Sequence, residues 1–177
     1  MKKLLFVFLA CGVAAITLSS CTKSAWELSY SRESYVEVDG LKWATKNVGA
    51  TEDNPYGNLY NFYQALEACP DGWRLPTGDE LEQLSRFHSE ITNYGGMNGM
   101  WFSGATPYKE GVDAVFLPMA GRFDNWNGMK DLGSCGYYLS STADYNGYTY
   151  LCFFIGGVSM CVGYNADVAC SVRCLKN

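Results

Sequence analysis

The clearest alternation of apolar and polar residues along the chain lies on either side of Asp39-Gly40. Asp-Gly is typical of the two-residue type I′ turn that joins two antiparallel strands. The turn pairs three positions across the strands: Val38 with Leu41, Glu37 with Lys42, and Val36 with Trp43. The four apolar side chains then share one face, and the two charged side chains form a pair on the other. The pattern predicts a β-hairpin over residues 35–44.

Two later stretches have apolar residues at helical spacing. After a turn at residues 54–57, the first predicts a short amphipathic helix from Leu59, Phe62, Tyr63 and Leu66. The second follows Pro76, where Thr77 and Glu80 form a capping box. Its expected buried stripe is Leu81, Leu84 and Phe87. The single histidine, His88, lies one turn after Leu84 and is expected to be a packed or half-exposed helix residue, not a catalytic base.

The second half of the chain is rich in glycine and tyrosine and reads as short strands. The expected strands cover residues 100–103, 112–117, 137–142, 148–155, 158–164 and 169–175. Two helices followed by a strand-rich half indicate an α+β domain. No internal repeat or linker divides it, so we expect one domain over residues 34–177.

The N-terminus combines a basic start, an apolar run and a small-residue site that ends in a cysteine. Residues 4–18 have the length of a signal peptide and are too short to span a bilayer comfortably. Leu18-Ser19-Ser20-Cys21 matches the lipobox of bacterial lipoproteins, in which the cysteine is acylated after cleavage. The alternative is an ordinary secretory signal that ends near a cysteine. We expect a lipoprotein signal peptide over residues 1–20, lipid on Cys21 and a tether over residues 21–33.

Export of this kind predicts a lipid anchor in the bacterial envelope, with the outer membrane as the expected location, and an oxidising compartment. Once Lys2 and Lys3 leave with the signal, 11 basic residues remain against 18 acidic ones. This balance argues against nucleic acid as a partner. The expected attachment to the membrane is through the lipid.

Six of the eight cysteines remain after the signal and the lipid site are set aside, which allows three disulfides. If Gly156-Gly157 is a hairpin turn, Cys152 faces Cys161 at a non-hydrogen-bonded position, where side chains approach most closely. The hairpin therefore predicts a Cys152–Cys161 disulfide.

Several ordered motifs resemble a known family. Residues 40–48 resemble its opening "G-x-x-W-x-x-x-N" segment, and residues 69–77, Cys-Pro-Asp-Gly-Trp-Arg-Leu-Pro-Thr, resemble its central "C-P-x-G-W-x-L-P-[ST]" signature. Later segments at 120–122, 136–142 and 171–174 resemble "G-x-R", "G-Y-x-W-S-S-T" and "S-V-R-C", although Leu139 replaces the usual Trp. The chain resembles the Fibrobacter succinogenes major paralogous domain (FISUMP) family over almost all of its mature length.

The resemblance implies a C-type-lectin-like fold, distantly similar to formylglycine-generating and sulfatase-modifying domains. In lectin-like folds a disulfide joins the early helical region to the last strand, which implies Cys69–Cys174. Cys135–Cys170 is then the remaining pair. The family gives a scaffold and not a function.

The residues do not form a recognisable catalytic or metal-binding constellation. No nucleophile motif accompanies His88, and Asp79, Glu80 and Glu82 read as a solvated helix face. Asp124-x-x-Asn127-Gly128 has too few oxygen ligands for a calcium loop, and the cysteine spacings do not suggest zinc. We expect no catalytic residue, no metal and no cofactor.

Two loops have the composition of recognition surfaces. Residues 144–150 mix tyrosine with small polar residues, which makes Tyr145, Tyr148 and Tyr150 candidate ligand contacts, with tyrosine packing as the alternative. In residues 122–128, Trp126 is placed to stack on a sugar face while Asp124 and Asn127 bond its hydroxyls.

These features favour a non-enzymatic binding module for an extracellular glycan or protein. One alternative is a structural or assembly component of an envelope or pilus complex. The other is a formylglycine-generating-like oxidase that uses Cys170 and Cys174, which are close in sequence.

Overall fold

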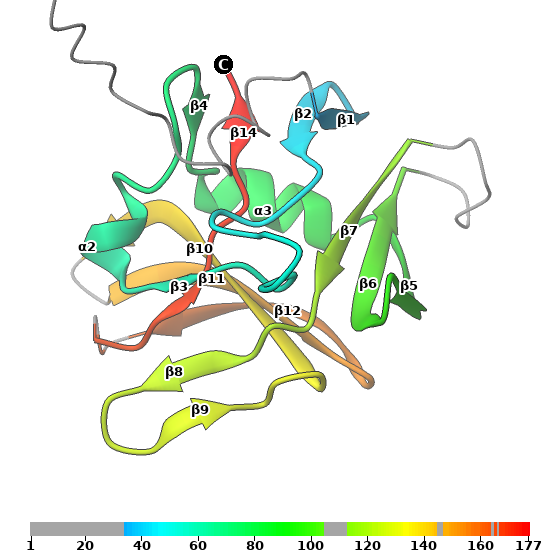
Figure 1. Cartoon of the computed structure of the whole chain (residues 1–177). Coiled ribbons are helices and arrows are strands. Elements are labelled where there is room, and N and C mark those ends of the chain that lie inside the picture. The colour runs from blue at the N-terminus through cyan, green and yellow to red at the C-terminus, as the bar shows by residue number, and fades with distance from the viewer. Residues whose placement is uncertain (1–33, 105–112, 145–146, 164, 166) are drawn as a thin grey trace, which may run out of the picture.

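The computed structural model describes residues 34–104, 113–144, 147–163, 165 and 167–177. The predicted signal peptide, Cys21, the tether and Tyr145 lie outside the described residues. The described chain is a mixed α+β structure in which strands dominate, as predicted (Figure 1). Its helices are α2 (Phe62–Ala65) and α3 (Gly78–Ser85).

The strands of the described residues form four sheets. One has the order β1-β2-β14-β4 and joins the two ends of the described chain: β1 (Tyr35–Val38), β2 (Leu41–Ala44), β14 (Leu175–Lys176) and β4 (Trp73–Arg74). The five-stranded sheet has the order β12-β11-β10-β13-β3: β12 (Gly157–Gly163), β11 (Gly147–Phe154), β10 (Cys135–Asp144), β13 (Cys170–Ser171) and β3 (Leu59–Tyr60). The two smaller sheets are β5 (His88–Tyr94), β6 (Met97–Ser103) and β7 (Ala114–Pro118), and the pair β8 (Arg122–Asp124) and β9 (Gly128–Lys130).

The predicted β1–β2 hairpin is confirmed with its register. Val38 pairs with Leu41 and Val36 pairs with Trp43. Asp39 and Gly40 have φ angles of 51° and 77°, the left-handed conformation that a type I′ turn requires at both central positions. The apolar face points into the core, where Trp43 is completely buried.

Helix α3 is also confirmed, together with its capping box. The Glu80 amide donates to the Thr77 hydroxyl and the Thr77 amide donates to the Glu80 carboxylate at 2.8 Å. Arg74 Nη1 donates to the same carboxylate at 2.7 Å. Hydrogen bonds from Arg74 and Thr77 lower the pKa of Glu80, with the Arg74 bond as the largest cause.

The other helical predictions need correction. Helix α2 exists but is short, and Leu59 lies before it in β3. Of its predicted stripe, Tyr63 is 70% exposed, so the apolar spacing there does not mark a buried face. His88 is the exposed first residue of β5 and not a helix residue, because α3 ends at Ser85.

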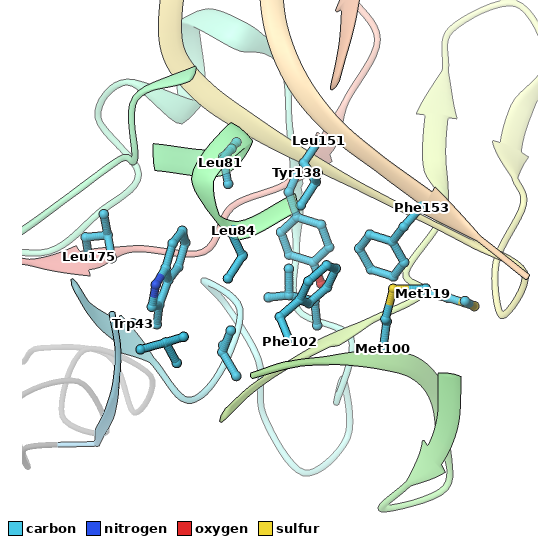
Figure 2. Packing of buried hydrophobic residues seen from close by; sticks show 13 residues of the cluster. Trp43, Leu81, Leu84, Met100, Phe102, Met119, Tyr138, Leu151, Phe153 and Leu175 are labelled. Carbon is cyan, nitrogen blue, oxygen red and sulfur yellow. The ribbon is translucent and has the colours of Figure 1, made fainter. Parts of the chain in front are cut away.

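The core lies on both faces of the five-stranded sheet. On one face α3 packs against β10, β11 and β12, and Tyr138, Leu151 and Phe153 join the buried cluster that contains Trp43 (Figure 2). The ring centroids of Phe102 and Phe153 lie 5.5 Å apart there, in an edge-to-face arrangement. The other face carries a second cluster that includes Tyr137, Leu139 and Tyr148. The sheet is therefore buried on both sides near its centre.

The predicted Cys69–Cys174 disulfide is present. It joins residues 105 positions apart and holds the segment before β4 against the segment before β14. The closure of so long a loop stabilises the folded chain by about 4–5 kcal/mol on chain-entropy grounds.

The β11–β12 hairpin has a different register from the predicted one. Its turn is Ile155-Gly156, so Cys152 pairs with Ser159 and Cys161 pairs with Tyr150. Both registers keep the same alternate residues on each face, and the hydrophobic pattern therefore does not distinguish them. Cys152 and Cys161 are diagonal neighbours across the hairpin. Their side chains interact, but no bond joins the two sulfur atoms.

The two remaining predicted disulfides are therefore absent from the structure. Cys135, Cys152, Cys161 and Cys170 are all free thiols. Strand β13 pairs with β10 at Ser171 and Tyr138, which leaves Cys135 two residues along its strand from the position opposite Cys170. That offset is roughly 7 Å along the strand, which separates the two thiols.

Candidate functional site

The β8–β9 hairpin carries the exposed aromatic residue singled out in the sequence. Its register pairs Arg122 with Lys130 and Phe123 with Met129. Because side chains alternate along a strand, Phe123 and Met129 lie on one face of the hairpin. These two side chains are 42% and 44% exposed. The hairpin therefore has an apolar face that the rest of the described chain leaves partly open.

The turn of this hairpin is fixed by its own polar side chains. The Asp124 carboxylate accepts from the Trp126 amide at 2.8 Å and from the Asn127 side-chain amide at 3.1 Å. These bonds, that of the Trp126 amide first, lower the pKa of Asp124. Gly128 completes the turn with a φ of 72°, which favours glycine. The result is a rigid turn that presents Trp126 with 87% of its surface exposed.

The base of the hairpin is anchored to the domain. Phe123 and Ala169 exchange two backbone hydrogen bonds of 2.8 Å. The Arg122 guanidinium lies over the Tyr137 ring at 4.9 Å from its centroid. The Tyr137 hydroxyl in turn donates to Asp131 at 2.8 Å, and Arg122 forms an ion pair with that carboxylate. These contacts hold the hairpin at its base while its tip remains in solvent.

The two described candidate tyrosines, Tyr148 and Tyr150, do not form an exposed face. Tyr148 is only 5% exposed, stacks on Phe62 at 5.4 Å and donates its hydroxyl to the Asn165 carbonyl. Tyr150 is half-buried between the Tyr148 and Tyr137 rings. Burial raises the pKa of both Tyr148 and Tyr150 to about 12. Tyr148 is therefore a packing residue of the core and does not form an exposed ligand contact.

Asp124 and Asn127 also have a structural role. They use two hydrogen bonds to fix the turn and keep further acceptor and donor capacity. Phe123 and Met129 were missed in the sequence. Their positions on either side of the Asp124–Gly128 turn were the available signal, since a hairpin pairs them on one face.

The cysteines do not provide the thiol pair that the oxidase alternative needs. Cys174 is bonded to Cys69, so Cys170 and Cys174 are not two free thiols. Burial raises the pKa of the Cys170 thiol to about 12, and likewise that of Cys152, which keeps both protonated at neutral pH.

Within the described ranges, no group of three or more His, Cys, Asp or Glu side chains is placed to hold a metal ion. The same residues contain no helix long and apolar enough to cross a membrane. No protein-family model, no curated protein and no solved structure matches the chain.

Proposed function

We propose that this chain is an exported, lipid-anchored envelope protein of the FISUMP type, with a C-type-lectin-like domain, that acts as a non-enzymatic binding module. The binding surface is the β8–β9 hairpin, and Trp126 is its central contact. The observation that carries this proposal is the 87% exposure of Trp126 on a turn held by internal hydrogen bonds. Large aromatic side chains in rigid, solvent-exposed positions are the preferred anchors of binding interfaces.

The placement of the hairpin in the molecule supports this proposal. Figure 1 shows β1 and the C-terminal β14 at one end of the described structure and the β8–β9 hairpin at the other. The chain enters the domain immediately before β1. A lipid on Cys21 would therefore hold the β1 end towards the membrane and leave Trp126 facing outwards.

The chemistry of the hairpin favours a protein ligand over a glycan. A sugar needs hydrogen bonds to its hydroxyls, and Asp124 and Asn127 already use part of their hydrogen-bonding capacity within the turn. One face of the strands that carry this turn presents the apolar Phe123 and Met129. A partner with a complementary apolar patch buries Trp126, Phe123 and Met129 together. A glycan that only stacks on Trp126 is the alternative ligand.

A structural or assembly role in an envelope complex is the second candidate. It is favoured by another exposed apolar turn, between β11 and β12, where Phe154 and Ile155 are both exposed. Permanent complexes bury larger and more apolar surfaces than transient ones. Engagement of both turns by one partner would distinguish this role from that of a receptor using the hairpin alone.

Site-specific photo-crosslinking in the native cell tests the proposal. A benzoylphenylalanine in place of Trp126 in the full chain is expected to crosslink to one defined protein. The matched control replaces Tyr63, which is also an exposed aromatic residue but lies on α2. The same products from both positions, or none from position 126 together with no glycan-array signal that depends on Trp126, would overturn the proposal. A third probe at Ile155 separates the receptor from the assembly role.

A further inference from the structure

A second concave site lies away from the hairpin, where residues of β1, β5, β6 and β7 meet the segment after β2. It is a cavity of about 330 Å³, a volume within the range of small-molecule sites. One wall is formed by Tyr94, Trp101 and Phe116, with Met97 beside them. Lys46 and Arg173 also line the cavity.

The aromatic wall has the geometry of a ring-binding surface. The three ring centroids lie 5.1 to 5.3 Å from one another, and the rings are tilted rather than parallel. Of the three side chains, Phe116 is buried and Tyr94 is exposed. The aromatic cluster is thus formed without a ligand and still leaves ring surface facing the cavity.

Two of the residues that line the cavity, Lys46 and Arg173, are cationic. Arg173 is 2% exposed and is held in place by Nε donating to Asn47 Oδ1 at 2.9 Å and Nη1 donating to the Ala44 carbonyl at 2.7 Å. Lys46 adds a second cation. None of the described residues that line the cavity carries a carboxylate. This local charge is opposite to that of the whole chain, which has a formal net charge of −5.

We propose that this cavity, here called the aromatic cleft, binds a small anionic molecule with a flat ring or an apolar ring-like body, of the class of aromatic carboxylates. The ring of the ligand stacks against Trp101 and Tyr94, and its carboxylate points towards Lys46 and Arg173. Cations set beside an apolar wall select for an anion that carries its own apolar body, because a hydrated inorganic anion gains nothing from the wall. This site does not depend on the hairpin and stands whether or not the hairpin binds a partner.

Binding of a matched set of indoles to the purified protein tests the aromatic cleft. The probes are indole-3-propionate, the corresponding neutral alcohol and the corresponding amine. Titration is followed by the indole N–H signals of the tryptophans in NMR spectra, with Trp101→Phe identifying the Trp101 signal. We expect saturable binding that shifts the Trp101 signal, with the alcohol roughly tenfold weaker than the carboxylate and the amine weaker still.

Three substitutions and one control complete the test. Lys46→Gln, at an exposed position, is expected to weaken the carboxylate three- to tenfold and leave the alcohol unchanged. Trp101→Ala is expected to weaken all probes at least tenfold, and the exposed Tyr94→Ala gives a second reading if Trp101→Ala unfolds. Trp126→Ala is expected to change nothing. The proposal is overturned by an absence of saturable binding, by an amine that binds as well as the carboxylate, by shifts at Trp126 in place of Trp101, or by a Lys46→Gln variant that retains full affinity.

Discussion

The β1–β2 and β8–β9 hairpins have similar turns and strand patterns but differ in how far their apolar faces are buried. Each has an aspartate at its turn and a glycine in the left-handed conformation, and each carries apolar residues on one face. The β1–β2 hairpin buries that face, and its Trp43 is fully enclosed. The β8–β9 hairpin leaves its apolar face half open, and its Trp126 is almost fully exposed.

This difference shows that local pattern and tertiary environment carry separate information. Alternation and turn residues produce a hairpin in both places, but the burial of its apolar face depends on what packs above it. β14 pairs with β2, and buried core residues pack against the apolar face of β1–β2, whereas Phe123 and Met129 of β8–β9 remain partly exposed in the described structure. Apolar surface that contributes little to folding is the surface to examine for function.

The largest expected effect on stability comes from removing the disulfide that holds β14, the strand paired with β2. Cys69→Ala together with Cys174→Ala removes the disulfide across 105 residues, and we expect a loss of about 4–5 kcal/mol in the free energy of unfolding. Urea denaturation measures the loss. Reduction of the wild-type protein is the matched control, and a change below about 1 kcal/mol in both experiments would show that β14 is held by packing alone.

The buried tryptophan is expected to have the next largest effect. Trp43→Ala leaves a cavity between the hairpin and α3, and the free energy of unfolding should fall by about 3–5 kcal/mol. Thermal unfolding followed by circular dichroism measures this. A decrease as small as that expected for an exposed tryptophan would remove the distinction between the two hairpins.

The capping box predicts a smaller effect that depends on pH. The pKa of Glu80 is lowered in the folded state by its bonds to Arg74 and Thr77, so its stabilisation is present above the ordinary pKa of 4.5 and is lost as pH falls through the lower folded value. Because Arg74 is partly exposed, we expect only about 1 kcal/mol from the ion pair and the cap together. Glu80→Gln should lose this amount at pH 7 and show a flatter acid limb in urea titrations between pH 2 and 5. A variant with the wild-type acid limb would contradict the assignment.

Tyr148→Phe tests whether that residue packs or binds. It removes the hydroxyl that donates to the Asn165 carbonyl and keeps the ring on Phe62, so stability should fall by about 1 kcal/mol. Crosslinking from position 126 should be unchanged. A loss of crosslinking with unchanged stability would return Tyr148 to the binding surface.

The elements that the sequence predicts well are those that local chemistry decides. The Asp39-Gly40 turn sets its own register, and the Thr77–Glu80 capping box fixes where α3 begins. The Cys69–Cys174 bond was reached from a family resemblance and not from local pattern. Trp126 was identified as a candidate because its turn residues flank it in the sequence.

The features that the sequence did not predict depend on contacts between segments that are distant in the sequence. The β11–β12 register and the fate of Cys152 and Cys161 follow from where the turn closes, and alternation is the same in both registers. Tyr148 looks like a recognition residue by composition, but Phe62 covers it from another part of the chain. The aromatic cleft joins residues from four strands and two connecting segments, and no single segment of the sequence contains its pattern.

The most direct test of the account is the free energy of unfolding of Trp126→Ala, measured by urea denaturation alongside Trp43→Ala. Trp126→Ala removes an exposed side chain outside the core, so it should lower the free energy of unfolding by less than about 0.5 kcal/mol. Trp43→Ala removes the same residue type from the core and should lower it by several kcal/mol. The account predicts that result, together with loss of binding of Trp126→Ala to the partner that the probe at position 126 identifies. A decrease of about 2 kcal/mol or more would contradict it, because Trp126 would then serve the fold.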